Sequence, residues 1–190
     1  MSKLIFEVGY NSRGSHKAFS DGKQTNGYFV WRSMIERCYS AKYHEKCPTY
    51  IGCSVANEWH DFQDFAEWFY NNPYTDKGYH LDKDILIKGN KVYSSETCCL
   101  VPQELNKLLT SRDRARGVYP EGVSLKKGQS RFLSQISIEG KRKHLGYFDC
   151  PNKAHQAYKK AKERNVRDMA VKWRDRIADN VFNALMNWSL

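Results

Sequence analysis

The hydrophobic period of the chain changes from two to about 3.6 residues near position 150, which restricts how its last third can fold. Residues 122–149 hold three short segments with strand character, and Glu139-Gly140 forms a hairpin-type turn between the last two. After Pro151, apolar residues recur every three or four positions, and no glycine or proline interrupts them. The pattern predicts a three-stranded antiparallel sheet module at 111–165, ending in a helix, and a C-terminal amphipathic helix at 166–190.

The positive charge of the protein is concentrated in this same third. The chain has 190 residues and a net charge of +10. Residues 112–176 hold 18 Lys and Arg against 7 Asp and Glu, whereas the other 125 residues hold 13 against 14. A basic segment of this kind favours a polyanion as partner, because each neutralised phosphate releases counterions. The alternative is a basic surface that only keeps the protein soluble.

The first 72 residues contain a polar arm and two helical stripes. Residues 1–27 are rich in Gly, Ser, Asn and Lys, which predicts a flexible arm. Apolar and aromatic residues at helical spacing predict amphipathic helices over 28–40 and 54–72. The aromatic stripe of the second helix is typical of a core rather than of a surface on which bases stack.

Residues 79–101 have strand character. They alternate between polar and apolar residues, a KGNK turn interrupts them, and Pro102 opens a short helix. The charged, glycine-containing connection at 111–118 predicts a domain boundary. The chain is therefore expected to be α+β, with one domain at 28–110 that precedes the sheet module.

The two faces of the predicted central strand differ in polarity. One face is expected to pack on the helix and holds Phe132, Ser134, Ile136 and Ile138. The other face is expected to present Arg131, Gln135 and Ser137 to base edges in a DNA major groove. The remaining basic residues of the module are expected to contact phosphates, namely Lys126, Lys127, Lys141, Arg142, Lys143 and His144.

Residues 117–165 resemble the DNA-binding domain of plant ethylene-response factors, a fold also found in bacteriophage homing-type endonucleases. The residues that carry this resemblance are Gly122-Val123-Ser124, Arg131-Phe132, Gln135-Ile136-Ser137, Leu145-Gly146-Tyr147-Phe148, Ala154, Ala157, Tyr158 and Ala161. The resemblance implies that the three-stranded sheet enters the major groove of double-stranded DNA and that side chains on its exposed face read the bases.

Residues 28–110 resemble the HNH-type homing endonucleases of bacteriophages. The matching residues are Trp31, Met34, Arg37-Cys38-Tyr39, Pro48-Thr49-Tyr50, Val55, Trp59, Phe62, Phe65, the run from Leu81 to Leu86, Gly89-Asn90, Tyr93-Ser94 and Leu105-Asn106. The resemblance implies a ββα fold around one divalent metal ion, Mg²⁺ or Mn²⁺, with a histidine as general base. Asp82 stands at the first metal-ligand position and Asn90 at the loop position.

The candidate site is degenerate, because Lys83 stands where that family has its catalytic histidine. Strand alternation places His80, Asp82 and Asp84 on one face, so His80 can serve as base with both aspartates on the metal. Alternatively, Lys83 is the base, or Asn106 or His60 completes the site. The non-catalytic interpretation is that these residues form the polar face of an exposed strand.

These observations predict a sequence-specific double-stranded DNA-binding protein with metal-dependent phosphodiester hydrolysis. One alternative is a catalytically inactive DNA-binding regulator on an HNH-derived scaffold. Another is a protein whose basic face binds RNA or an acidic partner. The C-terminal helix allows either a homodimer or cover for the module's own core.

The predicted location is the cytoplasm, that of the host cell for a phage protein, because no apolar run spans a membrane and no signal peptide is apparent. The six cysteines are then expected to be reduced. A zinc site from Cys38, Cys47, Cys53 and Cys98 is a further option, although no CxxC pair supports it.

Overall fold

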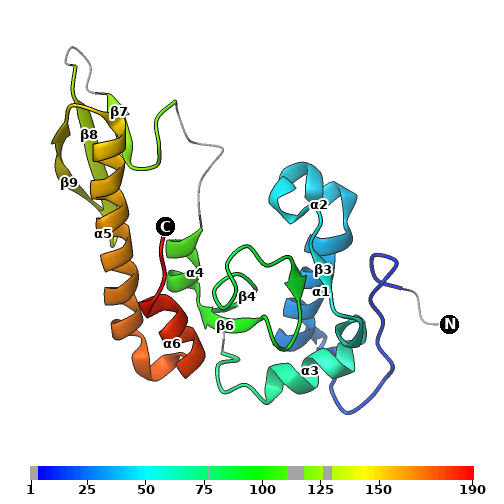
Figure 1. Ribbon diagram of the computed structural model, residues 1–190. Helices are drawn as coiled ribbons and strands as arrows, with labels where there is room; N and C mark the ends of the chain where they lie inside the picture. The colour runs from blue at the N-terminus through cyan, green and yellow to red at the C-terminus, as the bar shows by residue number, and fades with distance from the viewer. Residues whose placement is uncertain (1–3, 77, 111–117, 126–129) are drawn as a thin grey trace. The chain divides into compact units, whose positions relative to one another are not determined.

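The computed structural model describes residues 4–76, 78–110, 118–125 and 130–190, and the chain divides into two compact units, Met1–Asn106 and Lys107–Leu190 (Figure 1). Both units combine helices with small sheets, so the predicted α+β class is confirmed. Most of the predicted boundary at 111–118 lies outside the described residues. None of the helices in the described part of the chain is long and apolar enough to cross a membrane.

The first unit is built around a helix pair with an aromatic core. Its elements are β1 (Phe19–Ser20), β2 (Lys23–Gln24), α1 (Asn26–Tyr39), α2 (Ala41–Lys46), β3 (Ser54–Val55), α3 (Phe62–Tyr70), β4 (Tyr79–Asp82), β5 (Val92–Tyr93) and β6 (Cys99–Pro102), with 3-10 helices at Pro48–Tyr50 and Asn57–His60. The helix α4 (Gln103–Leu109) contains the boundary between the units. The indole of Trp31 on α1 donates a hydrogen bond of 2.8 Å to the carbonyl of Trp59, which fixes α1 against the segment before α3.

The predicted helix at 28–40 is confirmed, whereas the helix predicted over 54–72 begins later. Thr25 accepts a hydrogen bond from the Tyr28 amide and caps α1. The second helix begins at Phe62, because Asp61 is its N-cap and accepts from the Gln63 amide. The aromatic spacing continues through the 3-10 turn before Asp61, so spacing alone did not reveal the cap.

The strand–turn–strand prediction for 79–101 is only partly right. The strands β4 and β6 pair antiparallel, but the residues between them do not form one continuous strand. The Ser94 hydroxyl and the Thr97 hydroxyl lie 3.0 Å apart and each accepts from the other's backbone amide, which closes a turn. This turn separates β5 from β6, and β5 pairs parallel with β3 instead.

The middle of the arm predicted to be flexible, residues 10–16, is instead hydrogen-bonded to α3 and to the residues just before it. The Ser12 amide donates to Asp61 at 3.1 Å, and the His16 amide donates to Gln63 at 3.0 Å. The backbone of Tyr10 pairs with residues on either side of Asp61. Polar arms look flexible in a sequence, because partners about fifty positions away are not visible there.

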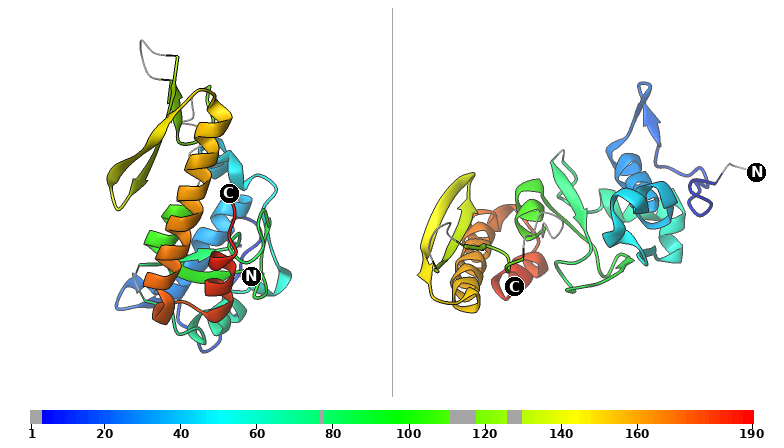
Figure 2. Two further views of the ribbon diagram at one scale, coloured as in Figure 1. Left: turned by 60° about the vertical axis from the view of Figure 1, so that its left-hand side comes forward. Right: turned by 90° about the horizontal axis from the view of Figure 1, so that it is seen from above.

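The second unit is a three-stranded sheet with a long helix across one face (Figure 2). The strands β7 (Val123–Leu125), β8 (Phe132–Ile138) and β9 (Lys141–Phe148) are antiparallel in the order β7-β8-β9. The helix α5 (Pro151–Lys172) contacts all three strands, and α6 (Asp179–Met186) follows a 3-10 turn at Arg174–Arg176. Three strands and a helix in this order were predicted.

The prediction of one separate C-terminal helix from 166 is wrong in two respects: the helix begins earlier, and it is interrupted after Lys172. The helix α5 continues without interruption through Lys172, and the chain then turns so that α6 packs on α5. The turn buries Ile177, Val181 and Leu185, whereas a straight helix would leave them without neighbours from α5. The three-to-four spacing is the same in both arrangements, so the sequence could not distinguish them.

Candidate functional site

The sheet of the second unit has one face covered by α5 and one face that α5 leaves open. On β8, Ser134 and Ile136 are buried beneath α5, as predicted. Cross-strand partners share a face, so the strand register assigns the other side chains. We use the name open face for the side that carries Ser124, Leu133, Gln135, Ser137, Arg142, His144 and Tyr147.

A β-bulge shapes the open face. The register shifts between Ser134 and Gln135, which leaves Leu145 on β9 as the extra residue. In a regular strand His144 and Tyr147 would point to opposite faces, but the bulge places both on the open face. Their rings lie 4.7 Å apart, centroid to centroid, at an interplanar angle of 57°. The sequence analysis did not place Tyr147 on the DNA-facing side. The signal for the bulge is Gly146, which has a φ of +135°, because an isolated glycine within a strand often marks a bulge.

The four basic residues that follow the turn, and that were expected to contact phosphates, lie on β9. The turn consists of Glu139 and Gly140, both with positive φ (50° and 76°), which is the hairpin geometry predicted. Within β9 the side chains alternate: Arg142 and His144 pair with Ser137 and Gln135 on the open face. Lys141 and Lys143 pair with Ile138 and Ile136 and therefore point to the other face, where both remain exposed.

Arg131 is held at the end of the sheet. Its Nε lies 3.6 Å from Oδ1 of Asp149, and its Nη2 donates a hydrogen bond of 3.4 Å to the Tyr147 carbonyl. The Arg131 side chain is 55% exposed and that of Asp149 is 85% exposed, so this ion pair is weak and easily exchanged for another anion. The predicted contacts Lys126 and Lys127 lie outside the described residues.

Four residues of the predicted metal site lie close together, but they hold a loop: Asp82, Lys83, Asp84 and Asn90. Oδ1 of Asp82 accepts from the backbone amides of Asp84 at 2.7 Å and Ile85 at 2.8 Å. The amide group of Asn90 donates to the carbonyls of Lys83 at 3.0 Å and Val92 at 2.6 Å. Both side chains satisfy backbone groups of the same loop, which is a structural role.

Lys83 is not placed to act as a base. Its side chain is 8% exposed, and Nζ donates to Oδ2 of Asp84 at 2.7 Å and to the Asn90 carbonyl at 2.7 Å. The nitrogen therefore acts as a donor on both contacts. The ammonium also lies 5.9 Å from the centre of the Tyr93 ring, so a cation already occupies the position beside Asp84.

This arrangement does not fit a divalent cation. The prediction that His80, Asp82 and Asp84 share one strand face is wrong for Asp84, because the strand β4 ends at Asp82. Burial raises the pKa of Asp82 above its ordinary value, and the two backbone hydrogen bonds offset this only in part. In the described ranges no group of three or more His, Cys, Asp or Glu side chains is arranged to hold a metal.

The other side chains proposed to complete the site have different surroundings. Nε2 of His60 lies 3.1 Å from the Val55 carbonyl and 3.5 Å from the Tyr39 hydroxyl, so His60 links α1 to β3. Asn106 lies on α4, partly buried. Three of the four cysteines considered for zinc are buried free thiols, and burial raises the pKa of Cys38 and of Cys98 to about 12.

Comparison with known proteins does not assign the chain to a family. No protein-family model matches the chain, and neither a curated protein nor a solved structure is significantly similar to it. The open face and the loop around Lys83 are therefore the features that bear on function.

Proposed function

We propose that the protein binds double-stranded DNA through the open face of β7-β8-β9. The observation that carries the proposal is the cross-strand pairing of Gln135 with His144 and of Ser137 with Arg142 on the face that α5 leaves open. These pairs put an amide, an imidazole and a guanidinium side by side. All three are groups that form hydrogen bonds with base edges in the major groove.

The dimensions of the sheet support the same partner. Neighbouring strands lie about 4.8 Å apart, so three strands present a surface about 10 Å wide. A major groove about 12 Å wide admits such a ribbon. Arg131, at the end of the sheet, can exchange its exposed partner Asp149 for a phosphate or a guanine.

The test is selection from a pool of random duplexes, followed by affinity measurements on the selected sequence. Arg142→Ala removes a cation from the open face, and Lys143→Ala removes the adjacent cation, which is also exposed, from the other face. We expect Arg142→Ala to weaken binding of the selected duplex about ten-fold or more and Lys143→Ala about three-fold or less.

Gln135→Ala and Arg131→Ala should weaken binding of the selected duplex more than binding of a random one. Equal losses on all sequences would refute base reading by these residues. Tighter binding of single-stranded RNA or DNA than of a duplex would refute the proposal itself.

Metal-dependent phosphodiester hydrolysis stays a prediction. The misfit between a divalent cation and the residues around Lys83 counts against it. The sharp test uses Asp82→Asn, which keeps the oxygen that caps the loop and removes the charge. Plasmid nicking that requires Mg²⁺ or Mn²⁺ and is lost in Asp82→Asn would establish the enzyme, and His80→Ala would then show whether that residue is the base. Duplex binding without nicking would leave a DNA-binding protein.

A further inference from the structure

The second unit carries more positive charge than its open face uses. Residues 107–190 hold 19 Lys and Arg against 8 Asp and Glu. Several of these cations have a carboxylate partner: Arg131 with Asp149, Lys159 with Glu163, Lys172 with Glu139 and Arg174 with Asp179. Each of these cations therefore already has a carboxylate neighbour within the second unit.

Four cations of α5 differ from these. Lys153, Lys160, Arg164 and Arg167 follow the spacing 7, 4 and 3 along the helix. At about 100° per residue they fall within an arc of roughly 60°, and they extend over about 21 Å of helix. Three of them are exposed and Arg167 is partly exposed. Across the part of the chain that the structure describes, none of the four side chains forms an ion pair.

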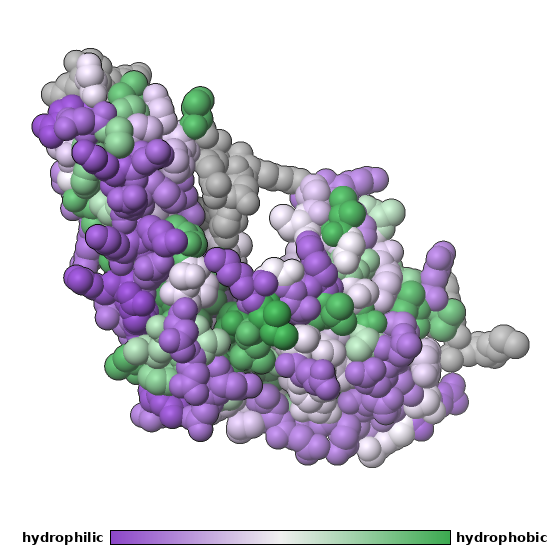
Figure 3. Space-filling view, in the orientation of Figure 1, coloured by the Kyte–Doolittle hydropathy of each residue, from purple (hydrophilic) through white to green (hydrophobic). Residues whose placement is uncertain are grey.

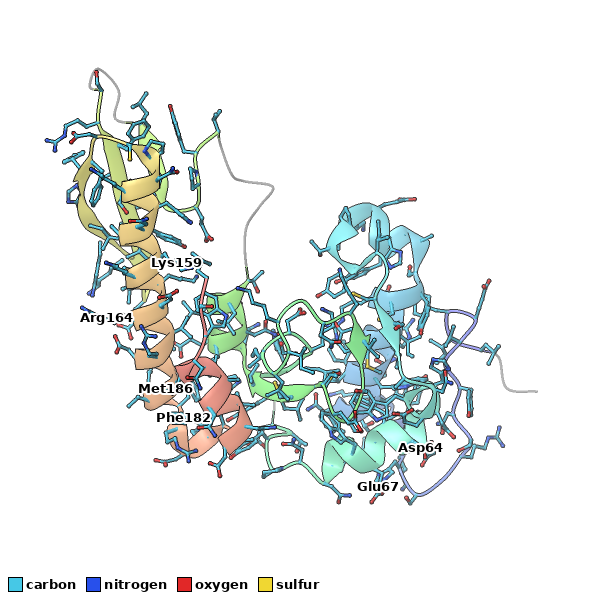
Figure 4. All side chains as sticks on the ribbon, in the orientation of Figure 1. Asp64, Glu67, Lys159, Arg164, Phe182 and Met186 are labelled. Carbon is cyan, nitrogen blue, oxygen red and sulfur yellow. The ribbon has the colours of Figure 1, made fainter. Side chains whose placement is uncertain are left out.

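This row points away from the rest of the unit. The buried residues of α5 lie on the opposite side of the helix and include Tyr158, Val166 and Met169, which face the sheet or α6. Figure 4 shows Arg164 and Lys159 on opposite sides of α5, and Lys159 donates to the Leu190 carbonyl at 2.6 Å. Figure 3 shows hydrophilic side chains along the length of α5. We call these four residues the outer row.

The acidic residues of α5 do not neutralise the outer row. Glu163 is 17% exposed, lies 3.9 Å from Lys159 and accepts from the Leu190 amide at 3.3 Å. Asp168 is exposed one turn beyond Arg164, near the end of the row. The outer row therefore keeps most of its positive charge and has no carboxylate partner among the described residues of its own unit.

A duplex on the open face is too far away to be that partner. The sheet and a helix about 10–12 Å in diameter separate the open face from the outer row. The Debye length is about 8 Å at physiological salt, so most of the attraction across this distance is screened. The outer row contributes little to a duplex that lies on the other side of the unit.

We propose that the outer row binds the phosphates of a second DNA segment, so that one protein molecule bridges two duplexes. The proposal rests on duplex binding by the open face. The chemistry of the row fits a phosphate backbone: unpaired ammonium and guanidinium groups follow one another at about 4.5, 6 and 10.5 Å along a straight helix. The expected contact is insensitive to sequence.

The experiment is capture of one duplex by another. A biotinylated 40-bp duplex is held on beads, the protein is added, and a fluorescent duplex of different sequence is added last. Lys160→Gln/Arg164→Gln removes two cations from the outer row, and Lys23→Gln/Lys42→Gln removes two exposed cations from the first unit as the matched control. Circular dichroism and thermal unfolding verify that each variant is folded.

We expect wild type and the matched control to capture the fluorescent duplex. Lys160→Gln/Arg164→Gln should need about ten-fold more protein for the same capture and should show a salt slope smaller by about two. Its affinity for the first duplex alone should change less than about two-fold. Capture by Lys160→Gln/Arg164→Gln at the wild-type level would overturn the proposal, and it would also reveal bridging by a dimer of open faces.

Two other results separate this inference from the proposed function. If wild type binds the first duplex but captures no second one, DNA binding by the outer row is refuted and duplex binding by the open face is not. Wild type that binds no duplex at all refutes the proposed function and the bridge with it.

Discussion

Gly122 is a residue at which a single added methyl group should strongly destabilise the second unit. Its φ is +77°, a conformation that costs an L-residue about 1–2 kcal/mol. A Cβ there would lie 2.7 Å from Cε2 of Tyr158 and closer still to Cγ and Cδ2. The ring is buried, so it has no free space into which to move.

The size of the effect follows from what Tyr158 would lose. Its hydroxyl donates a hydrogen bond of 2.8 Å to the Glu121 carboxylate, and a hydrogen bond to a charged group contributes about 1.5–3 kcal/mol. Displacing a buried aromatic ring costs about 3–5 kcal/mol when it is complete. We therefore expect Gly122→Ala to cost about 3–5 kcal/mol in total, a large part of the stability of a unit of this size.

Gly140→Ala is the matched control. Gly140 has nearly the same φ, +76°, but no atom lies within 4 Å of the position its Cβ would take. It should cost only the conformational penalty of about 1–2 kcal/mol. The assay is urea-dependent hydrogen exchange of peptides from β8 and α5, read by mass spectrometry, because this reports on the second unit alone.

A double-mutant cycle tests the cause. In a Tyr158→Ala background, Gly122→Ala should cost no more than Gly140→Ala, because the ring that it meets is gone. Equal costs for Gly122→Ala and Gly140→Ala in the wild-type background would refute the reasoning.

Further predictions concern the loop around Lys83. Asp82→Ala should lower the free energy of unfolding by about 1–2 kcal/mol in urea titrations, because two backbone amides lose their acceptor. Asp82→Asn should be at least as stable as wild type at pH 7. The raised pKa of Asp82 means that its contribution is most favourable below the unfolded value and is lost as pH rises through the folded one, so stability profiles against pH should be flatter in Asp82→Asn. Asn90→Ala should cost about 1–3 kcal/mol and increase proteolysis of the loop.

What could be predicted from the sequence was set by local chemistry. The faces of β8 follow from alternation, and the Glu139-Gly140 turn follows from the conformations that these residues tolerate. The helix α1 follows from the spacing of its buried residues. In each case the residues within one or two turns of the chain decide the structure.

What could not be predicted depends on distant partners. The arm is ordered by Asp61 and Gln63, about fifty positions away. The loop around Lys83 has the residue types of a metal site, and only the structure shows that Asp82 and Asn90 bond to backbone groups instead. The bulge at Leu145 moves Tyr147 to the open face, and the isolated Gly146 beside it is only a weak sequence signal.

The two basic surfaces of the second unit differ in how firmly their side chains are held, and this difference assigns them different tasks. On the open face the ring of His144 packs on the ring of Tyr147, and the Tyr147 carbonyl accepts a hydrogen bond from Arg131 at the end of the sheet. Groups that are oriented before binding lose less entropy and can distinguish one base pair from another. The outer row has no such supports, so its side chains adapt to phosphates at any register. Sequence preference should therefore change with open-face substitutions, whereas substitutions in the outer row should change only salt dependence and bridging.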